Sequence, residues 1–207
     1  MARRVFAAGA FFLLFCLLLP GVSAGGEGDV LFREDFDSHE RWEPWTFPRI
    51  QRHSTYAVEP MDGGYCLRAE SDNSASGLIF RGTFPVHEFP KVRWRWRAGF
   101  RERLTYRAAR LLYGQYPPVS ALNYIWANRE HQSDVLPNAY ARRSKMIILR
   151  GPEDVGVWQE EEVDILEDYR RVYGEDPPPQ AGLAVMNDSD GTGDGSVSYI
   201  DFIEVRR

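Results

Sequence analysis

Three acidic residues stand close together at Glu162, Asp164 and Glu167, in the order Glu-x-Asp-x-x-Glu. On a β-strand, Glu162 and Asp164 would share a face, because side chains alternate between the two sides of a sheet. A β-bulge at residues 165–166 would return Glu167 to that face. Two carboxylates about 5 Å apart act as nucleophile and general acid/base in retaining glycoside hydrolysis. The spacing therefore raises a catalytic hypothesis in which Glu162 and Glu167 react.

The same spacing resembles the active-site motif of the laminarinase-like retaining glycoside hydrolases, which are jelly rolls. The alternative is the acidic first turn of a surface helix. A 3.6-residue period runs through Ile165, Leu166, Tyr169, Val172 and Tyr173. That period predicts a helix over residues 163–173, ended by Gly174. On a helix Glu162 and Glu167 no longer converge, so the periodicity favours the non-catalytic alternative.

A second group of oxygen-bearing side chains lies in the loop over residues 187–195. Asp188, Asp190, Thr192 and Asp194 alternate with other residues, as in the first half of a calcium-binding loop. Tyr199 stands where an EF-hand would carry its closing glutamate. Asp and Gly are also the residues that any long hairpin loop needs. A structural calcium ion held by Asp188, Asp190 and Asp194 is therefore one hypothesis, and an ordinary turn is the other.

Amide and aromatic side chains alternate along residues 123–128. In an extended chain Asn123 points one way, and Tyr124, Trp126 and Asn128 point the other. Aromatic rings beside amides are the usual components of a glycan-binding site. The alternative is that Tyr124 and Trp126 belong to the core, where the aromatic residues of a β-sandwich mostly lie.

Cationic and apolar residues alternate without interruption along residues 91–98, Lys-Val-Arg-Trp-Arg-Trp-Arg-Ala. A period of two predicts a strand with the two tryptophans on one face and the four cations on the other. The cations either pair with carboxylates of neighbouring strands or line a concave face that binds an acidic ligand. In the second interpretation Arg93, Arg95 and Arg97 are the ligand-binding residues, and Arg110 joins them from the next strand.

The elements that must position these residues are short strands separated by turns. Gly63-Gly64, Pro117-Pro118 and the three prolines at 177–179 mark three of the turns. We predict ten strands, at residues 31–36, 55–59, 65–70, 77–81, 92–98, 107–113, 121–126, 145–149, 182–186 and 197–205. Ten short strands with one helix indicate a mainly β protein, specifically a β-sandwich of the jelly-roll type.

The N-terminus has the pattern of an export signal. Arg3 and Arg4 precede an apolar run over residues 5–19, which is too short for a typical membrane span. A small-x-small cleavage site ends at Ala24. We therefore predict a signal peptide over residues 1–24, a short leader over residues 25–29 and a single domain over residues 30–207. The expected location is periplasmic or extracellular, with no transmembrane segment after cleavage.

The overall charge and the cysteine content restrict the classes of partner. The net charge is −5 at pH 7. An acidic chain is not expected to bind nucleic acid, despite the local basic strand. Cys66 is the only cysteine outside the predicted signal, so we expect no internal disulfide.

Several longer stretches together resemble a bacterial exported family known as domain of unknown function 3047. They are residues 45–50, 53–56, 67–78, 94–96, 121–127, 168–171 with 174–175, and 185–190. The resemblance spans residues 30–205 and implies no particular activity. In that family the segment before Asp168 is usually helix-like and lacks the Glu-x-Asp-x-x-Glu spacing. The resemblance therefore implies that the hydrolase match is a coincidence.

These observations favour a non-catalytic binding module of the cell envelope, with a glycan or another polar or anionic ligand. The alternatives are a laminarinase-like hydrolase that uses Glu162 and Glu167, and a structural envelope protein without a small ligand.

Overall fold

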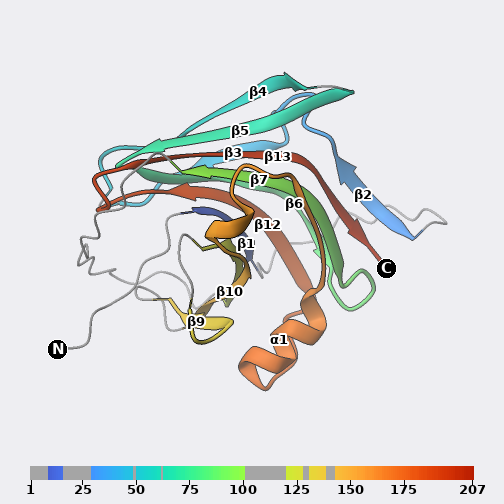
Figure 1. Cartoon of the computed structure of the whole chain (residues 1–207). Helices are drawn as coiled ribbons and strands as arrows, with labels where there is room; N and C mark the ends of the chain where they lie inside the picture. The colour runs from blue at the N-terminus through green and yellow to red at the C-terminus, as the bar shows by residue number, and fades with distance from the viewer. Residues whose placement is uncertain are drawn as a thin grey trace.

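The protein is mainly β: the described residues contain one α-helix, and their strands form two sheets (Figure 1). The structure is a computed structural model that describes residues 9–15, 29–48, 50–61, 63–100, 120–127, 131–138 and 143–207. The seven-stranded sheet has the order β3-β6-β12-β1-β8-β10-β9. The six-stranded sheet has the order β11-β7-β13-β5-β4, and β2 also pairs with β13.

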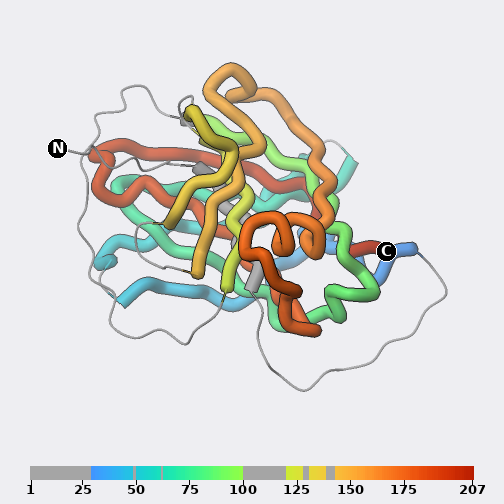
Figure 2. The backbone as a smooth tube through the Cα atoms, turned by 90° about the horizontal axis from the view of Figure 1, so that it is seen from below, coloured from blue at the N-terminus to red at the C-terminus, as the bar shows by residue number. Residues whose placement is uncertain are grey.

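The elements have the following bounds, in chain order. They are β1 Gly9–Phe15, β2 Val30–Glu34, β3 Trp42–Trp45, β4 Thr55–Met61, β5 Gly64–Asp72, β6 Ala75–Pro85, β7 Lys91–Phe100, β8 Ala121–Trp126, β9 Val135–Pro137, β10 Ser144–Arg150, η1 Pro152–Asp154, β11 Gln159–Asp164, α1 Ile165–Tyr173, β12 Gln180–Asp188 and β13 Gly195–Arg206. All strand pairs are antiparallel except β8 with β10, which is parallel. Figure 2 shows β8, β9 and β10 side by side, crossing the direction of the strands behind them.

The sequence predicted most of these strands within a few residues, and 121–126 coincides with β8. The predicted strand 107–113 lies outside the described residues. The prediction missed β1, β3, β9 and β11. It was also wrong about where the helix begins, because residues 163–164 end a strand and α1 starts at Ile165.

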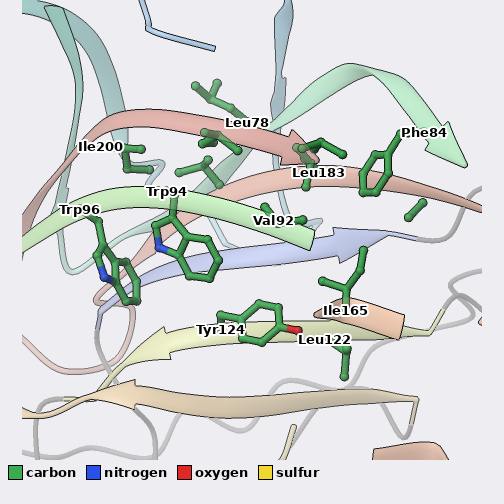
Figure 3. Close-up of a cluster of buried hydrophobic side chains, with 14 of the residues drawn as sticks. Leu78, Phe84, Val92, Trp94, Trp96, Leu122, Tyr124, Ile165, Leu183 and Ile200 are labelled. Carbon is green, nitrogen blue, oxygen red and sulfur yellow. The ribbon is translucent and has the colours of Figure 1, made fainter. Parts of the chain in front are cut away.

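Strand β7 contributes its aromatic side chains to the core between the two sheets. Trp94 and Trp96 are almost fully buried, and Figure 3 shows both on the side of β7 that faces Tyr124 of β8. The ring centroids lie 5.7 Å apart for Trp94–Tyr124 and 5.3 Å apart for Trp96–Trp126. Tilted and edge-to-face pairs at this separation add to the free energy of burial. The two sheets are thus joined by an aromatic cluster that begins with the alternating pattern of β7.

An ion pair between Glu161 of β11 and Arg150 lies beside this aromatic cluster. Glu161 accepts hydrogen bonds from the Trp96 indole at 3.1 Å and from Arg150 Nε at 2.6 Å. Its side chain is 11% exposed, and that of Arg150 is 28% exposed. The hydrogen bond to Glu161 raises the pKa of Arg150. Arg150 ends β10 in one sheet and Glu161 lies in the other, so the pair ties the sheets together.

A buried amide makes a second polar connection between the sheets. Asn187 of β12 is fully buried. Its Nδ2 donates to the backbone oxygens of Ala69 in β5 and Ser196 in β13, at 3.1 and 3.2 Å. Its Oδ1 accepts from Ser196 Oγ, and its backbone N–H donates to the Tyr56 hydroxyl. The amide therefore satisfies its hydrogen-bonding capacity with groups of the opposite sheet.

Helix α1 packs against the end of this core. Asp164 caps it by accepting a hydrogen bond from the backbone N–H of Glu167, and Gly174 ends it at φ 71°. Ile165 and Tyr169 are buried, as the 3.6-residue pattern predicted. The acidic residues before the cap belong to β11 rather than to the first helical turn.

We predict that Glu161→Gln lowers the free energy of unfolding by about 2 kcal/mol, because the partly buried Arg150 loses its hydrogen-bonded carboxylate and keeps only the longer contact with Asp154, at 3.9 Å. Glu162→Gln is the matched control on the same strand, since Glu162 points outward and contacts Arg206 at 3.4 Å. That control should cost less than about 1 kcal/mol. Urea unfolding of both variants measures the difference, and equal costs would contradict the prediction.

Candidate functional site

The cations of β7 lie on the outward face of the six-stranded sheet, opposite the acidic residues of β11. In the antiparallel register Lys91 faces Asp164, Arg93 faces Glu162, and Arg95 faces Glu160. Arg93 forms its ion pair diagonally, with Glu160. Figure 1 shows β7 and β13 arching over strands of the other sheet. Neighbouring carboxylates thus match much of the basic stripe.

Arg95 and Arg97 also contact aromatic rings on this face. Arg95 pairs with Asp201 of β13 at 2.9 Å, and its guanidinium lies 5.0 Å from the Trp158 ring centroid. Arg97 lies 5.0 Å from the same centroid and 4.5 Å from that of Tyr199. Among the residues that the structure describes, no carboxylate forms an ion pair with Arg97. Within the described ranges its guanidinium contacts these two rings, and a cation–π contact is worth about 0.5–1 kcal/mol at an exposed site.

The face continues from Tyr199 onto β5. Arg68, which is opposite Tyr199 in the register, donates to Glu70 at 2.6 Å and lies 3.6 Å from Glu59. Cys66, nearby on β5, is buried, and desolvation raises the pKa of its thiol. A raised pKa disfavours the thiolate, so Cys66 is not an activated nucleophile. The described residues of this face provide cations, hydrogen-bond acceptors and aromatic rings.

Comparison with known protein families finds one family that matches most of the chain. Residues 40–99 and 97–204 match the family described as "Protein of unknown function (DUF3047)". The chain belongs to this family. No curated protein matches the sequence.

The DUF3047 chain places three of the predicted ligand residues inside the fold. Asn123, Tyr124 and Trp126 are at most 2% exposed. Asn123 Nδ2 donates to Ser144 Oγ and to the backbone oxygen of Lys145. The Tyr124 hydroxyl donates to Asp168 at 2.9 Å, and the Trp126 indole donates to the Gly151 oxygen at 2.8 Å.

The structure therefore corrects the glycan-site interpretation of these three residues. Both faces of β8 are covered, so alternation did not bring either set of side chains to the surface. Two further predicted ligand residues, Arg110 and Asn128, lie outside the described residues.

The predicted catalytic trio is divided between two elements. Glu162 lies on β11, Asp164 is the N-cap of α1, and Glu167 lies in the first helical turn. The bulge that the hydrolase hypothesis requires at residues 165–166 is replaced by the start of the helix. The reason is local, since Asp164 uses its carboxylate to cap the helix and the apolar period of α1 begins at Ile165. The geometry gives the retaining mechanism no support.

The aspartate loop is held by hydrogen bonds within the protein. Asp188 Oδ1 accepts from the backbone N–H of Asp190, and Asn73 Oδ1 accepts from Gly191 and Gly193. Within the described part of the chain, no three His, Cys, Asp or Glu side chains are grouped so as to hold a metal. The calcium hypothesis for Asp188, Asp190 and Asp194 stays a prediction.

Sequence reasoning missed Trp158, Tyr199 and Asp201 as members of this face. Trp158 follows a turn and precedes β11, so no periodic pattern marks it. Tyr199 and Asp201 lay inside a predicted strand, but their neighbours on β7 are about a hundred positions away. Across the described ranges, no helix is both long enough and apolar enough to cross a membrane.

We predict that Asp188 makes stability depend on pH. Desolvation raises its pKa to about 7, from 3.8. The folded state then binds more protons than the unfolded state between pH 4 and 7, so stability falls as pH rises through that range, by up to about 1.4 kcal/mol per unit.

Asp188→Asn keeps the acceptor oxygen and should flatten this slope, whereas Asp37→Asn, an exposed control, should leave it unchanged. Urea unfolding at half-unit steps of pH, in EDTA and again in calcium, measures both slopes. A wild-type slope that is flat in EDTA would contradict the prediction, and a calcium-dependent rise in stability would favour the metal hypothesis.

Proposed function

We propose that this DUF3047 chain is an exported, non-catalytic binding module of the cell envelope that binds an acidic glycan. The observation that carries the proposal is the group formed by Arg97, Trp158 and Tyr199, joined by Arg95. Here a guanidinium without a carboxylate partner in the described structure lies against two rings that are only partly buried.

The chemistry of this group matches a sugar acid. A carboxylate on the ligand would form a charge-assisted bond with Arg97, whereas Arg93 and Arg95 are already paired with Glu160 and Asp201. Aromatic rings provide flat apolar surfaces for the C–H face of a pyranose ring. We therefore place the ligand at Arg97, which lies further along β7 than Arg93 and Arg95.

The export route and the finer fold class belong to the same proposal. The signal-like N-terminus supports a periplasmic or extracellular location. The jelly-roll assignment is supported by the two antiparallel sheets, although the parallel pairing of β8 with β10 departs from an all-antiparallel jelly roll.

A glycan array that includes uronic-acid polymers tests the proposal. Wild type should bind acidic glycans, and binding should weaken with added salt, since exposed charges are screened. Arg97→Ala and Trp158→Ala should each lower affinity about tenfold, as expected for the loss of 1–2 kcal/mol. Arg170→Ala, which removes an exposed, ion-paired arginine from α1, is the control and should bind as wild type does.

Two outcomes would contradict the proposal. If the wild type binds no glycan on the array, the chain is not a glycan-binding module of this kind. If it binds but Arg97→Ala and Arg170→Ala behave alike, the ligand lies elsewhere on the protein.

A further inference from the structure

Four side chains on the outward face of the six-stranded sheet form one row that runs across the strands. The register sets Tyr199 of β13 opposite Arg97 of β7 on one side and opposite Arg68 of β5 on the other. Trp158 directly precedes β11, whose register with β7 puts it beside Arg97. We call these four residues the cross-strand row. It alternates ring, cation, ring and cation.

Small residues border the cross-strand row in two places. Beyond Arg68, the next strand places the exposed Ala57 in the same row. Gly99 follows Arg97 on this face of β7. Within the described part of the chain, a Cβ at Gly99 would contact only the backbone oxygen of Val197, at 3.4 Å. A ligand that lies along the row therefore meets no large described side chain at Ala57 or Gly99.

Both cations of the row have hydrogen-bond donors for a ligand. Arg97 contacts the two rings and forms no ion pair with a described carboxylate. Arg68 donates to Glu70 through Nη2 and lies 3.6 Å from Glu59 through Nε. A guanidinium carries five N–H groups, so these two contacts leave further donors for a carboxylate. The row can therefore bind two carboxylates, one at each cation.

The spacing of these two cations suits a linear polymer of sugar acids. Neighbouring strands lie about 4.8 Å apart, so Arg97 and Arg68 are roughly 9.5 Å apart at the backbone. In a flat two-fold ribbon of pyranose rings, each sugar covers about the width of one strand. Carboxylates on the same edge of such a ribbon recur at every second sugar. Two alternate sugar acids would therefore meet the cations, and the other two sugars would meet the rings.

We propose that the cross-strand row binds a stretch of four sugars of a linear polyuronide, which lies across the strands. The inference rests on the proposed function, because it uses the same site. It adds the class of polymer, the direction in which the polymer lies and a second ligand-binding cation, Arg68.

The other direction, along β7, fits such a polymer less well. Cations on one face of a strand recur at every second residue, about 6.7 Å, which matches neither one sugar nor two. A polymer along β7 would also meet Arg95 and Arg93, which are already paired with Asp201 and Glu160. Those two carboxylates would repel the acidic groups of the ligand.

Calorimetric titration of the full chain with oligomannuronates of one to six sugars tests the proposal, since mannuronate polymers form a flat two-fold ribbon. Wild type should bind four sugars about tenfold more tightly than two, because the second carboxylate gains its own charge-assisted bond. Longer oligomers should gain little more. Arg68→Gln keeps hydrogen-bond donors and should remove this gain, with the affinity for two sugars unchanged.

Arg93→Gln is the matched control, because Arg93 lies on the same face outside the cross-strand row. It should bind both lengths as wild type does. Arg97→Gln should weaken the binding of both. A polymer that lies along β7 would reverse the results for Arg68→Gln and Arg93→Gln, which would overturn the proposal.

Two further results would also overturn it: equal affinity of wild type for two and four sugars, or an equal loss at both lengths in Arg68→Gln, as a merely structural effect would give. These results leave the glycan-binding function in place, since they concern only how the ligand lies. Absence of binding to every acidic glycan, by contrast, would remove the proposed function and this inference with it.

Discussion

The alternating pattern of β7 is the constraint on which the rest of the structure depends. Because side chains of a strand alternate, burying Trp94 and Trp96 forces Arg93, Arg95 and Arg97 to the other face. The buried tryptophans need apolar partners in the second sheet, and Tyr124 and Trp126 of β8 are those partners. The exposed set requires a neighbour rich in carboxylates, which β11 supplies. Core and surface are therefore two consequences of one eight-residue pattern.

The charges of the outer face are distributed unevenly along that strand. Toward the start of β7, carboxylates of β11 and β13 lie beside the cations. Beyond Arg95 the carboxylates give way to Trp158 and Tyr199, so the character of the face changes from ionic to aromatic. Among the described residues, Arg97 therefore lies against two rings and forms no ion pair with a carboxylate. This gradient, more than the number of arginines, is the reason why we propose the ligand site in this region.

The local sequence pattern predicted most of the strands, but not which strands pair with each other. Residues 121–126 form β8 as expected, since a short apolar run bounded by turns needs no distant information. β11 was missed because four consecutive acidic or amide residues before an apolar period resemble a helical first turn. What makes them a strand is pairing with β7, about seventy positions earlier, and no local rule contains that information.

For the same reason the sequence assigned Tyr124 and Trp126 to a ligand site or to the core without deciding between them, since burial depends on what lies across the sheet. For the group around Arg97, the alternating pattern of β7 predicted that the cation is exposed. It could not predict the two rings, because Trp158 lies in a loop and Tyr199 lies on β13.

The buried amide of Asn187 has a consequence for how the two sheets move. A slide of one sheet past the other by a single residue would separate Asn187 from Ala69, Ser196 and Tyr56 at once, and each orphaned buried group costs about 1–3 kcal/mol. The sheets are therefore expected to behave as one rigid body without a shearing motion between the layers. A rigid support means that the rings and guanidinium groups of the outer face are already arranged before any ligand arrives. Association at such a surface has little ordering entropy to overcome, so modest contacts suffice for recognition.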